Sequence, residues 1–266
     1  MNAQQLIRDG NLDEALQLLQ VEIRENPADS KLRIFLFQLL AVLGQWERAT
    51  KQLDVIAKMD DSALAMVYEC RAAIECEMYR EEVFSGNKDP VFMGKPEEWQ
   101  ALLLQSLKLS AMEKGAESQT LHTQAMEMAT TSAGSINGDA FEWIADADTR
   151  LGPLLEVFVD GQYRWVPFTN IKRLAIEAPE NLRDFVWMPA HIQWETEGES
   201  FVLIPTRYPF SAEKNHQLAL SRQTEWVEKG EDSFIGFGQR LFATDVNDYS
   251  LLDVRDVFFK QNSSVS

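Results

Sequence analysis

The densest group of side chains that could do chemistry lies in the segment DADTR, where Asp146, Asp148 and Arg150 alternate with small residues. Alternating carboxylates at this spacing resemble the start of a calcium-binding loop. Such a loop also needs an oxygen ligand at its fifth position and a Glu at its twelfth, which are Arg150 and Val157 here. We therefore predict a structural role, in which these three residues hold the junction of two domains by charge-assisted hydrogen bonds.

Other arrangements that catalysis or cofactor binding requires are missing from the sequence. The three histidines form no HExxH pair and neither cysteine lies in a CxxC pair, so no zinc site is expected. No complete phosphate-binding glycine loop and no GxSxG serine is found. We predict no catalytic residues, no metal and no cofactor. One alternative remains open, an enzyme that holds a small polar substrate at the domain junction through Asp146, Arg150 and Asp184.

The charge balance limits the partners. The chain has 42 acidic and 25 basic residues, and its net charge of −17 repels a phosphate backbone. We therefore expect neither nucleic acid nor a membrane as a partner. The longest apolar stretch is too short to span a bilayer, and the first residues lack a signal-peptide pattern. Cys70 and Cys76, six apart on an expected helix, do not share a face, so we expect no disulfide and a cytoplasmic location.

The elements that must position these side chains begin with a repeat. The segments that start at Gly10 and Gly44 share a Gly, a large apolar residue two positions on, an Ala five on and a Leu nine on. Their offset of 44 − 10 = 34 residues is the period of tetratricopeptide repeats, although an ordinary bundle can show it by coincidence. The glycines suit helix ends, and Ala15 and Ala49 allow close helix packing. We predict about three helical hairpins, a tetratricopeptide-like α-α superhelix over residues 1–133.

Stacked repeats of this kind leave a concave face that usually binds a peptide or a helix. The register assigns six residues to that face, all on the first helix of a pair. They are Lys31, Ile34, Gln38, Val42, Tyr68 and Ala72. We predict that these residues bind a partner protein, with the alternative that Ile34 or Val42 belongs to the core.

The second half has a different pattern. After a linker rich in Gly and Ser at 131–139, the sequence shows short runs typical of strands, which predict a small β-rich, barrel-like domain over residues 139–266. Asp160 and Gly161 between two such runs predict a hairpin with strands at 155–159 and 162–166. Helical pieces are expected after Thr169 and between Glu213 and Lys229. Further strands are expected at 185–188, 191–194, 201–204, 240–244 and 250–254.

Five blocks of this half resemble the ImpE family, also called TagJ or SciE. They read FEWIADADTRLGPLLEVFVDGQYRWVPF, NLRDFVWMPA, PTRYP, TEW and GQRLFATD. Phe210, directly after RYP, departs from the family's small residue. Six residues within the blocks form a structural signature, namely Trp143, Asp146, Asp148, Arg150, Arg183 and Asp184.

The resemblance implies an accessory protein of the type VI secretion system. It further implies contact with the small sheath subunit and a connection to the ClpV-type ATPase that disassembles the sheath. It brings no catalytic residues with it. Our hypothesis is a non-catalytic adaptor whose helical groove captures a segment of the sheath subunit. A scaffold that acts by self-association is a further alternative.

Overall fold

The N-terminal half is a row of antiparallel helices, as the repeat predicts. The computed structural model describes residues 2–230 and 233–260. The first helices are α1 (Ala3–Arg8), α2 (Leu12–Glu25), α3 (Ser30–Val42), α4 (Trp46–Met59) and α5 (Leu64–Phe84). Gly10 and Gly44 have φ of 82° and 67° at the ends of α1 and α3, and Ala15 and Ala49 are fully buried. The predicted tetratricopeptide-like fold is therefore confirmed here.

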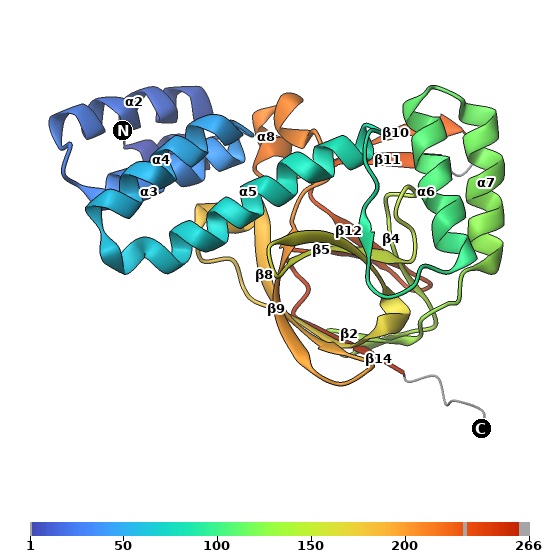
Figure 1. Cartoon of the computed structure of the whole chain (residues 1–266). Helices are drawn as coiled ribbons and strands as arrows, with labels where there is room; N and C mark the ends of the chain where they lie inside the picture. The colour runs from blue at the N-terminus through green and yellow to red at the C-terminus, as the bar shows by residue number, and fades with distance from the viewer. Residues whose placement is uncertain (1, 231–232, 261–266) are drawn as a thin grey trace.

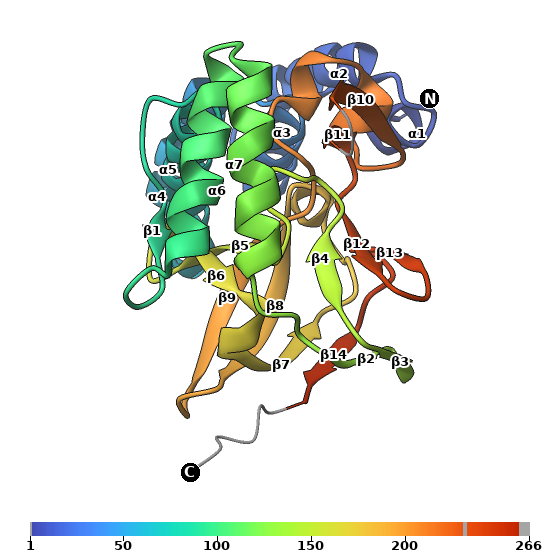
Figure 2. The same cartoon turned by 90° about the vertical axis from the view of Figure 1, so that its right-hand side faces the viewer.

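A third hairpin stands apart from this row. Helices α6 (Glu98–Ala111) and α7 (Gly115–Met128) pair with each other at the far end of α5 (Figures 1 and 2). Ser106 and Ser118 lie at their crossing, where each hydroxyl donates to the other's backbone carbonyl at 2.9 Å.

No helix within residues 2–230 and 233–260 has the length and hydropathy that a membrane crossing needs.

The C-terminal half supplies eight strands of a nine-stranded sheet in the order β1-β6-β5-β9-β8-β7-β14-β2-β3, and β1 comes from the segment between α5 and α6. Its strands are β1 (Val91–Phe92), β2 (Gly134–Ile136), β3 (Asp139–Phe141), β5 (Leu154–Val159), β6 (Gln162–Pro167), β7 (Ile171–Ile176), β8 (Trp187–Trp194), β9 (Glu199–Pro205) and β14 (Asp256–Phe259). The sheet curls around its own apolar core (Figure 1). This confirms a strand-rich second half.

Two small sheets complete this half. One has the order β13-β12-β4, and the other is the hairpin β10-β11. Their strands are β4 (Ile144–Asp146), β10 (Thr224–Gly230), β11 (Ser233–Gly238), β12 (Leu241–Thr244) and β13 (Asp248–Ser250).

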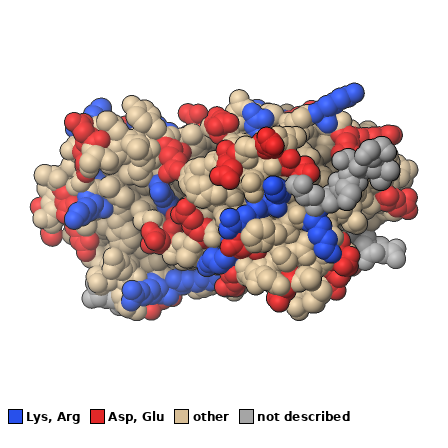
Figure 3. All heavy atoms as spheres, turned by 90° about the horizontal axis from the view of Figure 1, so that it is seen from below, with Lys and Arg blue, Asp and Glu red and all other residues tan. Residues whose placement is uncertain are grey.

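On the face seen in Figure 3, acidic side chains are spread from one end of the molecule to the other.

The hairpin predicted at Asp160 and Gly161 is confirmed. These residues have φ of 52° and 71°, and β5 pairs with β6 on either side of them. The helical piece predicted after Thr169 is wrong, because only a 3₁₀ turn precedes strand β7. In β7, the register shifts between Ile171 and Arg173, so that two consecutive charged residues point outward and the apolar spacing looks helical.

Other predictions of strands, helices and the linker need correction. The segments at 185–188 and 191–194 are mostly one strand, β8, which follows the 3₁₀ helix η3 (Leu182–Phe185). The region from Glu213 to Lys229 holds only one short α-helix, α8 (His216–Ala219), and then becomes β10. Residues 251–253 form a turn rather than a strand. The expected linker contributes β2, which pairs with β3 and β14. The boundaries 1–133 and 139–266 stay a prediction.

Candidate functional site: the concave face of the helical repeats

The inner faces of α3 and α5 are largely covered by the protein's own C-terminal half. Arg207, which follows β9, donates from Nη1 to the carbonyl of Val42 at 2.5 Å and from Nη2 to that of Ala41 at 3.0 Å. The guanidinium therefore adds hydrogen bonds to carbonyls in the last turn of α3, where the carbonyl of Ala41 also accepts from the N–H of Gly44. The Val42 side chain is fully buried, so the prediction that it lines an open groove is wrong.

Helix η3 covers the next part of the concave face. The backbone N–H of Leu182 donates to Oε1 of Gln38 at 3.1 Å. Arg183 reaches α5, where Nη1 contacts Sγ of Cys70 at 2.9 Å and Oε2 of Glu69 at 3.4 Å. Burial raises the pKa of the Cys70 thiol to about 11, although the positive charge of Arg183 acts in the opposite direction. Two of the predicted residues, Gln38 and Arg183, thus join the two halves of the chain.

A buried network of charges fixes the end of α5 to the sheet. Arg80 is almost fully buried and donates to both carboxylate oxygens of Glu156 on β5, at 2.7 and 2.9 Å. Arg240 donates to the same carboxylate and to that of Asp146 on β4. Burial opposes the charge on Glu156, but Arg80 and Arg240 outweigh it and hold its pKa at about 2. One carboxylate therefore links two cations from distant parts of the chain.

The DADTR segment extends this network. Asp146 accepts hydrogen bonds from Arg240, from the hydroxyl of Tyr208 at 3.1 Å and from the N–H of Asp148 at 2.9 Å. Burial raises its pKa to about 7, against the influence of Arg240. Asp148 binds the guanidinium of Arg150 with both oxygens, and Arg150 lies 4.6 Å from the centre of the Phe84 ring on α5. All three side chains are thus engaged inside the protein.

This arrangement leaves little space for a substrate beside the carboxylates. A cavity of about 50 Å³ lies next to the network, lined by residues that include Glu77, Arg80 and Tyr208. That volume compares with about 30 Å³ for one water molecule in the liquid. In the described ranges, no three His, Cys, Asp or Glu side chains lie close enough together to hold a metal ion.

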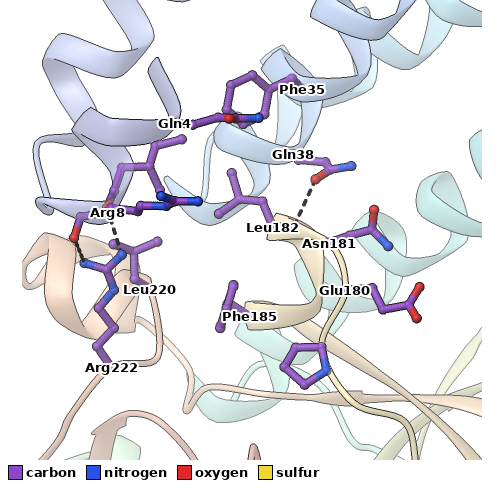
Figure 4. A pocket seen from close by; sticks show the side chains of 12 residues that line it. Gln4, Arg8, Phe35, Gln38, Glu180, Asn181, Leu182, Phe185, Leu220 and Arg222 are labelled. Carbon is purple, nitrogen blue, oxygen red and sulfur yellow. Dashed lines mark hydrogen bonds between the residues drawn. The ribbon is translucent and has the colours of Figure 1, made fainter. Parts of the chain in front are cut away.

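The larger opening is a pocket of about 490 Å³ between the two halves (Figure 4). Its walls come from α1, α3, η3 and the segment after α8, and they are mainly apolar with a polar rim. The lining residues are Gln4, Ile7, Arg8, Phe35, Gln38, Pro179, Glu180, Asn181, Leu182, Phe185, Leu220 and Arg222. We call this the junction pocket.

Two polar residues hold the walls of the junction pocket in place. Arg222 donates to the backbone carbonyls of Arg8 and Ile7 at 2.9 and 2.8 Å, which caps the end of α1 (Figure 4). Asp184 accepts the N–H groups of Glu180 and Asn181 at 2.8 and 2.7 Å and so fixes the start of η3. Hydrogen bonds within the chain therefore fix the walls of the pocket.

The remaining predicted residues are spread over the surface. Lys31 is exposed and Ile34 is partly buried against the helical core, while Gln38 alone of the six lines the junction pocket. Tyr68 is 65% exposed and Ala72 lies in a different groove. The sequence reasoning missed Phe35, although its spacing of three residues before Gln38 is the signal that places both on one face of α3.

Trp143 stands outside these contacts. It lies between β3 and β4, and its side chain is 39% exposed. Of the six signature residues, Asp146, Asp148, Arg150, Arg183 and Asp184 all hydrogen-bond inside the protein, as described above.

Known proteins resemble this chain in sequence and in fold. Residues 138–258 match the ImpE protein family, and residues 6–74 match the tetratricopeptide repeat. Over 261 residues the chain is 47% identical to the type VI secretion system accessory component TagJ of Pseudomonas aeruginosa. The matched region covers 98% of this chain and 92% of that protein. The chain belongs to the ImpE family. The crystal structure of protein VPA1032 from Vibrio parahaemolyticus has the same fold, with a TM-score of 0.91, 24% identity and 99% of both chains covered.

Proposed function

We propose that this ImpE-family protein is an accessory component of a type VI secretion system and that it acts by binding proteins rather than by catalysis. The 47% identity to a type VI accessory component over nearly the whole chain supports the first part. The tetratricopeptide repeats support the second, because such repeats bind segments of other proteins. The burial of Asp146 and Asp148 against arginines favours an adaptor over an enzyme at the domain junction.

The junction pocket is the observation that carries this proposal. It lies on the concave face, between helices α1 and α3, and it remains open although Arg207 and η3 cover neighbouring parts of that face. Apolar walls formed by Phe35, Leu182 and Phe185 suit one large apolar side chain, and the polar rim can fix the orientation of a bound segment. We propose that this segment belongs to the small sheath subunit and that binding links the sheath to the ClpV-type ATPase. This role implies a cytoplasmic location.

The way in which the protein's own chain binds here supports this mode of recognition. The backbone of Leu182 donates to Gln38 while its side chain packs on the helical core, so a main-chain hydrogen bond and an apolar anchor act together. A partner segment beside it can use the same two kinds of contact.

A pull-down with the small sheath subunit of the same system tests the proposal. Phe35→Arg places a charge in the apolar wall, and Gln4→Arg changes only the exposed rim. Val21→Arg, at an exposed apolar position on α2, is the matched control. We expect Phe35→Arg to lose the subunit, Gln4→Arg to weaken it and Val21→Arg to retain it, with thermal unfolding confirming that all three fold.

Normal binding by folded Phe35→Arg and Gln4→Arg variants would refute the site. A protein that sediments as a concentration-dependent oligomer and binds no sheath subunit would favour the self-associating scaffold instead. Adding the ATPase to the same assay tests whether it joins the complex or competes for the pocket.

A further inference from the structure

A second groove lies between α5 and the β5–β6 hairpin. It consists of two adjoining cavities of about 320 and 130 Å³, which share Cys76 and Gly161. Its lining has no residue in common with the junction pocket. Tyr79 and Tyr163 line the larger cavity, and Ala72 lines the smaller one. We call it the α5 groove.

The α5 groove lies where helix α5 and the sheet move apart, next to a point at which the helix and the β5–β6 turn come close together. A Cβ built on Gly161 would lie 3.9 Å from the Cβ of Ala72, so the hairpin turn and the helix nearly touch there. Strands β5 and β9 share a single register pair, Phe158 with Leu203, whereas β5 and β6 share six. Phe201, two residues before that pair on β9, remains 45% exposed in the wall of the smaller cavity. Apolar surface is therefore left open on both sides of the narrow point.

The walls of the α5 groove carry charge of one sign. Three lining residues have carboxylates, Glu69, Glu75 and Asp160, and the lining has no lysine or arginine. Glu69 pairs with Arg183 at 3.4 Å, whereas neither Glu75 nor Asp160 forms an ion pair within the described part of the chain. Besides Arg183, two cations border the groove: Arg164 donates to Oε1 of the lining residue Gln162 at 2.7 Å, and Nζ of Lys88 lies 4.8 Å from the centre of the Tyr79 ring.

We propose that the α5 groove binds a positively charged segment of another protein, in which a large apolar side chain is flanked by lysine or arginine. The apolar side chain enters the larger cavity beside Tyr79 and the exposed side chain of Val91, and the flanking cations lie against Glu75 and Asp160. The charge of the walls selects this occupant, because a carboxylate-bearing segment is repelled and an uncharged one gains only the apolar contact. This goes beyond the proposed function, since it gives the adaptor a second docking site.

A binding assay with synthetic peptides tests the proposal on the full-length protein. The probes are three fluorescein-labelled twelve-residue peptides with a central Phe, flanked by Lys, by Ser or by Glu, and fluorescence anisotropy reports binding. We expect the Lys peptide to bind about tenfold more tightly than the Ser peptide and the Glu peptide not to bind. Binding of the Lys peptide should weaken as the salt concentration rises, because its charged contacts are near the surface.

Variants locate the binding site. Ala72→Arg fills the narrow part of the groove and adds a positive charge there, so it should abolish binding of the Lys peptide. Glu75→Lys, at an exposed position, should weaken binding about fivefold. Glu127→Lys on α7 makes the same charge change away from the groove and should have no effect. Phe35→Arg in the junction pocket should also have no effect, which separates this site from the proposed function.

Equal binding of the Lys and Glu peptides, or no binding of any peptide by the wild type, would overturn the proposal. So would unchanged binding of the Lys peptide by Glu75→Lys, a result that stays decisive even if Ala72→Arg does not fold. Loss of binding in Phe35→Arg alone would assign the peptide to the junction pocket and overturn the assignment to the α5 groove.

Discussion

Replacing Glu156 by Gln removes the negative charge that two buried arginines share. Glu156 is fully buried, and its two oxygens accept hydrogen bonds from Arg80 on α5 and from Arg240 just before β12. The amide of Gln keeps the size of the side chain but presents one acceptor oxygen and an NH₂ group that faces a guanidinium. Two cations are then left in a buried site with incomplete compensation.

The expected loss is large because removing one partner of a buried ion pair costs about 3–5 kcal/mol of unfolding free energy. A domain of this size loses about 2–4 °C of melting temperature per kcal/mol, so we expect Tm to fall by about 6–20 °C. The matched control is Asp256→Asn, which breaks the ion pair between Asp256 and Arg173, whose side chains are 40% and 44% exposed. That change should cost at most about 1 kcal/mol.

Chemical denaturation followed by tryptophan fluorescence gives both free energies, and its pH dependence gives a second check. The pKa of Glu156 is about 2 in the folded protein and 4.5 without its surroundings. Because the folded pKa is the lower one, its stabilisation is present above pH 4.5 and is lost as the pH falls toward 2. The difference between wild type and Glu156→Gln should shrink in that window. A loss as small as that of Asp256→Asn at pH 7 would refute the reasoning.

Local geometry leads to two further substitutions and one test of reactivity. Gly161→Ala should destabilise the protein by about 1 kcal/mol in the same denaturation assay, because its φ of 71° disfavours a residue with a Cβ. Arg222→Ala should speed hydrogen exchange in α1, because the carbonyls of Ile7 and Arg8 lose the hydrogen bonds from its guanidinium, without affecting exchange in α7. Burial raises the pKa of Cys70 to about 11 and that of Cys76 to about 12, so both thiols should react with a thiol reagent at pH 8 only after unfolding.

Local patterns in the sequence predicted the elements whose cause is local. The glycine and alanine positions of the 34-residue repeat are the positive-φ ends and buried crossings of the helices. The Asp160–Gly161 pair makes the predicted turn. Strand β7 could not be recognised in this way, because the register shift near Ile171 breaks the alternation that identifies a half-buried strand.

The candidate site was harder to predict because its contacts join residues far apart in the chain. Gln38 and Leu182 are 144 positions apart, and Val42 and Arg207 are 165 apart. No periodicity in the sequence shows that an arginine after β9 donates to the carbonyls at the end of α3. The concave face was therefore expected to be open. Of the six residues that the repeat register assigned to that face, Gln38 lines the junction pocket and Ala72 lines the α5 groove, and their binding of a partner stays a prediction.

The covered concave face changes what the repeats can do. In an open superhelix a partner can choose its position along the whole groove, whereas here Arg207, η3 and the Glu156 network fix the C-terminal half against α3 and α5. Among the described residues, the junction pocket and the α5 groove are two openings on this face. A buried network resists small relative motions of the halves, because such motions would break its ion pairs while the charges are still shielded from water. The protein therefore holds its two proposed docking sites at a fixed separation, which suits an adaptor that must present one partner to another in a defined orientation.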